Sequence, residues 1–173
     1  MSFFVYYKKC DPVRYRCTSR LAKRLTLDIE VIKFVDAIQT FDGRYLSAYL
    51  HRFCDKHSLG FKKLRFGDGG DALVFVNRKT NIVIKIDGNT NIHHSDDVPR
   101  LAIPTAYTLI KNNQPDAVSD NRVIRIQPRA NRSKNLLMAA MEKIENYSTN
   151  DIGWDFHEGN VGVYNGRAVM IDW

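Results

Sequence analysis

Three oxygen-bearing side chains near the end of this 173-residue chain have a spacing suited to phosphate chemistry. Asp155 and Asn160 are five positions apart in the sequence DFHEGN, and Asp172 follows twelve positions later. A carboxylate can accept the proton of a hydroxyl group, and hard oxygen ligands suit Mg²⁺. The three side chains are therefore candidates for an active site. The alternative is that they are only the polar ends of a surface hairpin.

A tight hairpin is predicted between Asn160 and Asp172. The dipeptide Asn165–Gly166 separates the runs VGVY and RAVMIDW, and it suits the positive φ angles of a type I′ turn. Folding there returns residue 172 to within about one or two strand spacings of residue 160. In an ideal register Asn160 lies opposite Ile171, so the side chains of Asn160 and Asp172 would leave by opposite faces. We therefore expect Asn160 to lie in the loop, outside the regular ladder.

A glycine-rich turn, FGDGGDALVF, precedes a predicted strand. Gly67, Gly69 and Gly70 let the backbone turn tightly and approach a phosphate without interference from a Cβ atom. The string fits the nucleotide-covering pattern G-x-G-x-x-G-x-V through Val74, with Ala72 at the third glycine position. It is neither a Walker nor a Rossmann loop. Ordinary hairpin chemistry remains the alternative.

Lys85 lies in the next predicted strand, NIVIKID, on the face that also carries Val83. A lysine on the strand beside a glycine loop can reach the α and β phosphates of a nucleotide. The alternative is a lysine whose stem covers a half-exposed sheet while its ammonium group stays in water.

The periodicity along the chain predicts an α+β fold, in which a pair of helices precedes a run of five strands in the sequence and one helix and a hairpin follow it. Leu27, Val31, Phe34, Val35 and Ile38 form an apolar stripe, with Thr26 as the expected cap of the first helix. The expected helices span residues 27–41, 44–58 and 133–147, and the expected strands span 61–66, 71–77, 81–87, 105–112 and 121–127. We expect residues 1–60 to form a basic arm and a helical pair packed on a domain of residues 61–173.

Composition and charge limit the classes of function. The net charge is +7, and seven of the first 25 residues are Lys or Arg against one Asp. Such a field attracts nucleic acid or an acidic protein surface, although a solvated basic face would look the same. No run approaches the roughly 20 apolar residues that a membrane span needs. The three cysteines are an odd number in a chain of this size, which favours reduced thiols. The N-terminal residues MSFFVYYKKC lack the order of charged and apolar residues that a secretory signal has, so we expect a cytoplasmic location.

In combination these motifs resemble two branches of the protein-kinase-like fold. DFHEGN followed by MIDW is similar to the D-x-H-x-G-N … IDW signature of aminoglycoside and choline phosphotransferases. The GxGGxAxVF … VIK front half and FHEGN are similar to the early protein kinase of short-tailed coliphages, the autographiviruses. The resemblance covers roughly residues 61–173.

This resemblance implies roles for individual residues in the use of ATP and Mg²⁺. Asp155 corresponds to the catalytic base and Lys85 to the clamp on the phosphates, whereas His157 lies near the transferred phosphate. Asn160 and Asp172 correspond to the ligands of the metal. The nucleotide would be covered by Gly67, Gly69, Gly70 and Val74.

The resemblance also implies a fold and a biological setting. We expect a reduced kinase-like fold: a five-stranded antiparallel sheet, a helix, a catalytic loop and a hairpin, with an N-terminal helical extension and no full C-terminal lobe. The implied activity is that of a bacteriophage serine/threonine protein kinase. It would modify host proteins, including components of the transcription machinery, in the host cytoplasm.

Some positions depart from the kinase pattern. Gly153 stands where a histidine usually braces the catalytic loop. No glutamate occurs between Lys85 and Glu142, so Asp96 or Asp97 would have to replace the usual partner of the lysine. Two other functions therefore stay open. One is a pseudokinase that inhibits a partner by binding, and the other is a nucleic-acid-binding module that uses the basic N-terminal region.

Overall fold

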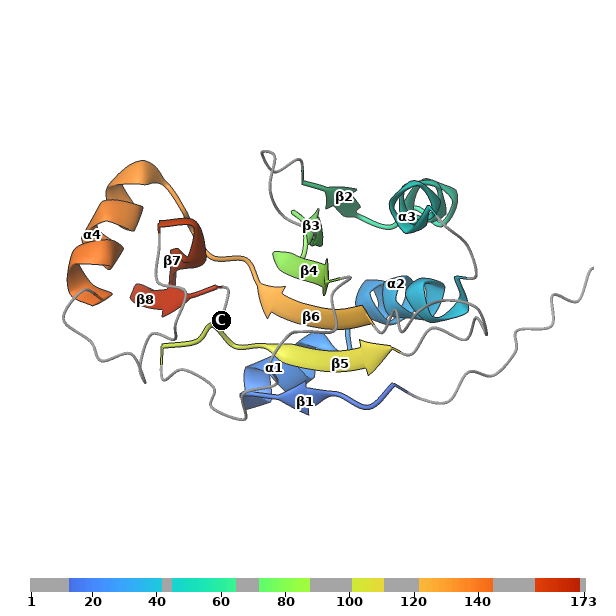
Figure 1. Cartoon of the computed structure of the whole chain (residues 1–173), viewed down its shortest axis with the longest axis horizontal. Coiled ribbons are helices and arrows are strands. Elements are labelled where there is room, and N and C mark those ends of the chain that lie inside the picture. Colours follow the sequence, from blue (N-terminus) through green and yellow to red (C-terminus); the bar gives the residue numbers. More distant parts are fainter. Residues whose placement is uncertain are drawn as a thin grey trace, which may run out of the picture.

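The computed structural model describes residues 13–41, 45–64, 72–87, 101–110, 122–144 and 158–171. Within these ranges one antiparallel sheet of six strands runs through the centre of the protein, in the order β1-β5-β6-β4-β3-β2 (Figure 1). The strands are β1 (Arg16–Cys17), β2 (Phe61–Lys63), β3 (Leu73–Asn77), β4 (Ile82–Asp87), β5 (Ala106–Ile110) and β6 (Arg122–Pro128). Lys85 is in β4, which lies between β6 and β3 and is therefore a central strand.

Three helices pack their apolar stripes against one face of this sheet. They are α1 (Arg20–Leu25), α2 (Ile29–Thr40) and α3 (Leu46–Lys56). The ring of Phe34 in α2 contacts those of Phe61 and Phe75, with centroids 4.8 and 4.9 Å away. The same core contains the isoleucines of β4 and β6. Helices and strands thus share one apolar core, and it draws residues from both sides of position 60.

The start of α2 shows how a side chain sets a helix boundary. The carboxylate of Asp28 accepts hydrogen bonds from the backbone N–H groups of Glu30 and Val31, at 2.9 and 3.1 Å. A short polar side chain in this position satisfies donors that have no partner inside the helix. The helix therefore begins at Ile29. The prediction that Leu27 belongs to the apolar stripe is wrong, because this side chain precedes the cap and is 70% exposed.

A smaller unit follows the sheet and has its own apolar cluster. It contains α4 (Lys134–Ile144), a 3₁₀ turn (Glu158–Asn160) and the hairpin of β7 (Val161–Tyr164) and β8 (Arg167–Met170). Asn165 and Gly166 have φ angles of 50° and 74°, so the predicted turn with two positive φ angles is confirmed. Figure 1 shows α4 and the hairpin together at one end of the molecule, beside the ends of β5 and β6.

Two chain segments connect the hairpin to the sheet. The N–H of Ile103, just before β5, donates to the carbonyl of Met170 at 2.8 Å. After β6, the N–H of Asn131 donates to the carbonyl of Val163, also at 2.8 Å. A Cβ atom on Gly162 would lie only 2.7 Å from the Cβ of Ala130, so the hairpin can approach this second segment closely because residue 162 is glycine.

The expected α+β class is confirmed, but the described sheet has six strands rather than the expected five. The additional strand, β1, comes from the basic arm and pairs with β5 through Arg16–Tyr107 and Cys17–Ala106. Helix α1 in the same arm was also not predicted. Two residues of strand are too few to show alternation, and six residues of helix show less than two turns of periodicity.

None of the helices in the described ranges has the combination of length and apolar character that a bilayer crossing requires.

Candidate functional site

The candidate site lies where the central sheet meets the C-terminal hairpin. Lys85 reaches from β4 to the hairpin, and its Nζ donates a hydrogen bond of 2.7 Å to the carbonyl oxygen of Ile171. These residues are 86 positions apart in the sequence. The lysine predicted from the strand pattern and the residue directly before Asp172 are therefore in direct contact.

Ile171 also contacts Asn160, through its N–H group rather than its carbonyl group. The N–H of Ile171 donates to the carbonyl of Asn160 at 2.7 Å, and Asn160 is 6% exposed. The last pair of the hairpin ladder is Val161–Met170, and Asn160 belongs to the preceding 3₁₀ turn. The expectation that Asn160 lies outside the ladder is confirmed. Its role as a metal ligand stays a prediction.

Val74 and Arg125 flank Lys85 on the neighbouring strands. In the antiparallel register Val74 of β3 and Arg125 of β6 lie directly opposite Lys85, so all three side chains leave the sheet by the same face. Val74 is 7% exposed. The register therefore places the expected nucleotide-covering valine next to the expected phosphate clamp.

An ion pair between Asp87 and Arg125 completes this row. A guanidinium nitrogen of Arg125 contacts the carboxylate of Asp87, and the two side chains are 11% and 18% exposed respectively. Two like charges directly opposite on neighbouring strands destabilise a sheet. The Asp87 carboxylate offsets this repulsion, because it adds a negative charge beside the cations of Arg125 and Lys85.

Sequence reasoning missed both members of this ion pair. The alternation in NIVIKID does place Asp87 on the same face as Lys85, and this signal was available. The partner strand was not identifiable from the sequence. Only the strand order, with β6 beside β4, shows that Arg125 lies opposite Lys85.

A chain of buried polar contacts holds the hairpin against this face. The amide of Gln127 donates to the hydroxyl of Thr105 at 2.9 Å, and that hydroxyl donates to the carbonyl of Ile103 at 2.8 Å. Ile103 in turn donates its N–H to the carbonyl of Met170. Gln127 and Thr105 are almost completely buried. Buried polar groups that satisfy one another define a geometry more strictly than apolar contacts do, so the position of the hairpin is well defined.

The other predicted site residues lie outside the described residues. They are Gly67, Gly69, Gly70, Asp155, His157 and Asp172, together with the suggested replacements Asp96 and Asp97. Within the part of the chain that the structure describes, no group of three or more His, Cys, Asp and Glu side chains is arranged to hold a metal ion. Of the three predicted oxygen donors, only Asn160 lies within the described residues.

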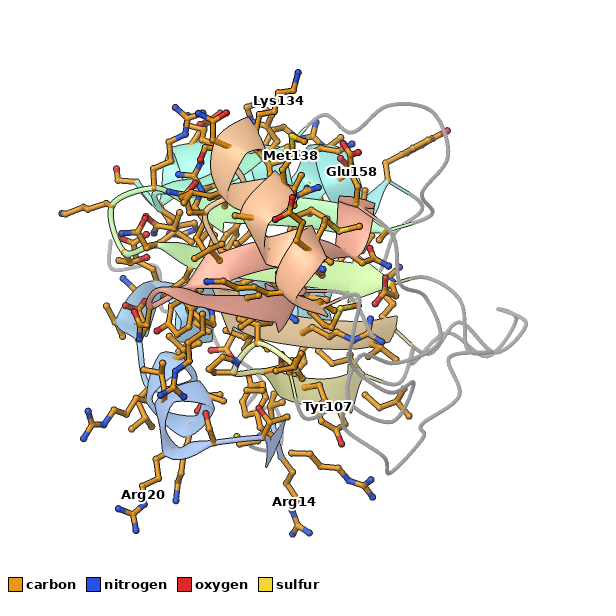
Figure 2. All side chains as sticks on the ribbon, turned by 90° about the vertical axis from the view of Figure 1, so that its left-hand side faces the viewer. Arg14, Arg20, Tyr107, Lys134, Met138 and Glu158 are labelled. Carbon is orange, nitrogen blue, oxygen red and sulfur yellow. The ribbon has the colours of Figure 1, made fainter. Side chains whose placement is uncertain are left out.

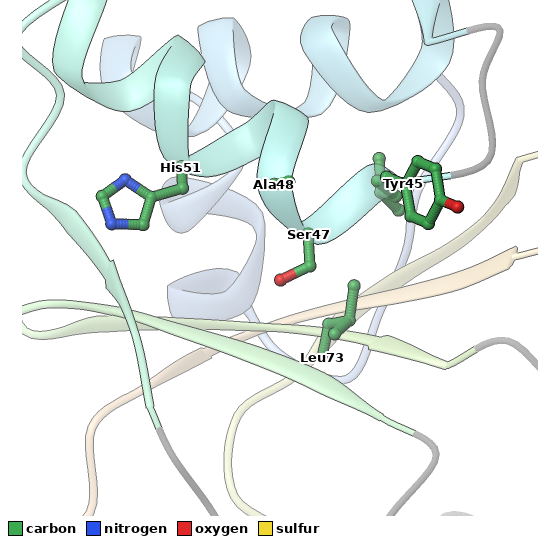
Figure 3. Close-up of a pocket in the computed structure, with 6 residues that line it drawn as sticks. Tyr45, Ser47, Ala48, His51 and Leu73 are labelled. Atoms are coloured by element: carbon green, nitrogen blue, oxygen red, sulfur yellow. The ribbon is translucent and has the colours of Figure 1, made fainter.

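A separate pocket of about 460 Å³ lies on the helix-covered face of the sheet, whereas Lys85 leaves the sheet by the other face. It is lined by the first turns of α3 and by Leu73, and Figure 3 shows Ser47 pointing toward Leu73. Leu73 and its neighbour Val74 leave the strand by opposite faces. The pocket is therefore not part of the candidate site.

Comparisons of the chain with protein-family models, with curated proteins and with solved structures found no match.

Proposed function

We propose that the protein is an ATP- and Mg²⁺-dependent phosphotransferase that modifies serine or threonine residues of another protein. The contact between Lys85 and Ile171 is the observation that supports this most strongly. It joins β4, the second strand after the glycine-rich turn, to the residue before Asp172. A phosphate-binding lysine and a metal-binding carboxylate must meet at one triphosphate, and this contact brings their two chain segments together.

Each proposed role follows from the chemistry of the side chain. The ammonium group of Lys85 attracts the α and β phosphates, and the glycines at 67, 69 and 70 let the backbone cover them. Asp155 accepts the proton of the substrate hydroxyl as its oxygen attacks the γ phosphorus, and the bond from that phosphorus to ADP breaks. The sequence resemblance would put His157 near the transferred group. Protein substrates remain an inference from the sequence resemblance.

The oxygen donors fit magnesium better than a softer metal. Asn160 offers an amide oxygen and Asp172 a carboxylate, and Mg²⁺ prefers hard oxygen ligands. When bound, the ion would neutralise negative charge on the phosphates. The main-chain link between Asn160 and Ile171 supports this assignment, because it fixes Asn160 next to the residue that precedes Asp172.

Asp87 is our candidate for the acidic group that usually accompanies the lysine in kinases. It lies two residues from Lys85 on the same strand and face, and it forms the ion pair with Arg125. Asp87 is nearer in sequence than Asp96 or Asp97, and it lies within the regular sheet. We infer that the Asp87–Arg125 pair sets the electrostatic surroundings of Lys85.

Transfer of phosphate from γ-labelled ATP tests the proposal. Purified protein is incubated with Mg²⁺ and a bacterial lysate, and labelled proteins are analysed for phosphoserine and phosphothreonine. Lys85→Met, Asp155→Asn and Asp172→Asn should each lower the rate about 100-fold or more, because each removes a group that acts on the reacting phosphates. The matched control is Lys63→Met on the exposed edge strand β2, which should leave the rate unchanged.

Two results would contradict this function. Absence of transfer by the unaltered protein would do so, and so would equal losses in Lys85→Met and Lys63→Met. The pseudokinase alternative predicts that Asp155→Asn keeps the full biological effect. Circular dichroism of each variant separates loss of chemistry from loss of folding.

A further inference from the structure

Exposed positive and apolar side chains follow one another along α1, the turn after it and the first turn of α2. The cations are Arg20, Lys23 and Arg24, and the apolar members are Leu27, Ile29 and Ile32; we call these six residues the α1–α2 surface. The three apolar side chains are 70%, 62% and 38% exposed. In Figure 2 the labelled Arg20 extends away from the body of the protein. Contiguous exposed apolar groups next to charges are typical of protein interaction sites.

Backbone hydrogen bonds keep the two kinds of side chain adjacent. The N–H of Leu27 donates to the carbonyl of Arg24 at 3.1 Å, which closes the turn after α1. Ile29 and Ile32 are three positions apart in α2 and so lie on one side of the helix. The apolar members therefore begin directly beside the last cations of α1.

The two carboxylates between Arg24 and Ile32 have hydrogen-bond partners within the protein. Asp28 caps α2 through its bonds to two backbone N–H groups. Glu30 accepts hydrogen bonds from the N–H of Gly60 and from the side-chain amide of Asn77, both at 2.7 Å. Hydrogen bonds from neutral N–H groups fix the positions of these two carboxylates without cancelling their charge. None of the ion pairs found among the described residues involves Arg20, Lys23 or Arg24, so the three cations of α1 stay available to a partner molecule.

We propose that the α1–α2 surface binds an acidic protein segment that also carries aliphatic side chains. Charge complementarity selects a negative partner and speeds its association. The exposed aliphatic side chains favour a protein over a nucleic acid, because phosphate contacts use cations and not leucine or isoleucine. This surface is separate from the Lys85 site, and the proposal does not depend on phosphate transfer.

Three fluorescent probes of equal net charge test the nature of the partner. They are a peptide of alternating Glu and Leu, a peptide of alternating Glu and Ser, and a single-stranded oligonucleotide. Fluorescence anisotropy with the full-length protein should show the Glu–Leu peptide binding at least about fivefold more tightly than either other probe. Affinity should fall as salt is raised, because exposed charges are screened.

Two sets of substitutions locate the site. Replacing Arg20, Lys23 and Arg24 by Glu should weaken binding of the Glu–Leu peptide about tenfold or more. Replacing Leu27, Ile29 and Ile32 by Ser should reduce it to the level of the Glu–Ser peptide. The charge-matched control replaces Lys63, Arg78 and Lys79 by Glu, which are exposed cations on β2 and the β3–β4 turn, and should change affinity less than twofold.

Several outcomes would overturn the proposal. Binding of the oligonucleotide as tightly as the Glu–Leu peptide would assign the surface to nucleic acid. Equal weakening by the control set would show that only net charge matters. Self-association that the Ser variant abolishes, measured by sedimentation, would assign the surface to a second copy of this chain. Melting curves of both variants verify folding, and since all six residues are exposed or half-exposed we expect near-native values.

Discussion

The two faces of strand β4 differ in what they contribute to the protein. Ile82, Ile84 and Ile86 point to the helices and are at most 3% exposed. Val83, Lys85 and Asp87 point to the other side and are half-buried. One six-residue strand therefore supplies both the apolar core and the ionisable groups of the candidate site.

The two faces need different things from the residues that pack against them. Apolar contacts are non-directional, so the helix face needs only volume and shape that fit. A buried or half-buried ion needs a partner at a particular position. The Lys85 face is therefore the one on which residues far apart in the sequence have to meet with correct geometry.

The helix face should show the largest effect on stability. Phe34→Ala removes a completely buried ring that packs against Phe61 and Phe75. We expect the free energy of unfolding to fall by about 3–5 kcal/mol, as for other buried aromatic residues. Urea denaturation measures this change. A loss below about 1 kcal/mol would show that the helices contribute little to the core.

The ion pair on the opposite face tests the dependence on a specific partner. Asp87→Ala leaves Arg125 without its ion-pair partner in largely buried surroundings, and we expect a loss of about 3 kcal/mol. The double variant Asp87→Leu with Arg125→Met should lose much less, because it removes both charges together. Urea denaturation of Asp87→Leu, of Arg125→Met and of the double variant gives the coupling energy. Additive losses would show that the pair is not coupled.

The same variants separate stability from function. If Asp87 and Arg125 set the surroundings of Lys85, the stable double variant should still show an ATP KM raised about tenfold. An unchanged KM would assign the pair a structural role only. Asp87→Glu, which keeps the charge, should recover part of the affinity for ATP.

The smallest effect concerns the buried thiol of Cys54 in α3, on the helix face. Burial raises its pKa from 9.0 to about 11, with a further contribution from the charge of Asp55. The folded state therefore holds the thiol proton more tightly than the unfolded state does. Its contribution to stability is complete below pH 9 and is lost as the pH rises from 9 to about 11. Thermal unfolding should show a flatter pH dependence over this range for Cys54→Ala, and parallel curves would contradict this.

Much of the fold followed from local patterns. The strand around Val74 is a short run of β-branched and aromatic residues, and the burial of the strand around Lys85 alternates. Asn165–Gly166 identified the hairpin because few dipeptides suit two positive φ angles. The position of Asn160 in a turn followed from the same register. These features depend on neighbouring residues, which the sequence displays directly.

Features that depend on distant partners were not predictable. Strand β1 exists because Arg16 pairs with Tyr107, 91 residues away by number, and the Asp87–Arg125 ion pair depends on the order of the strands. The cap of α2 was misplaced because Thr26 and Asp28 are both good capping residues, and only the observed hydrogen bonds distinguish them. The predicted roles of Asp155, His157 and Asp172 stay predictions.

The acceptor for the ammonium group of Lys85 is a main-chain oxygen, and this has a consequence for how the contact can be altered. Exchanging the side chain of Ile171 leaves that oxygen in place, so related sequences can vary at this position without losing the interaction. A single inserted or deleted residue in the hairpin would shift the carbonyl along the ladder and leave the lysine facing a different group. The contact thus tolerates substitutions at residue 171 but is sensitive to changes in the length of the segment before it.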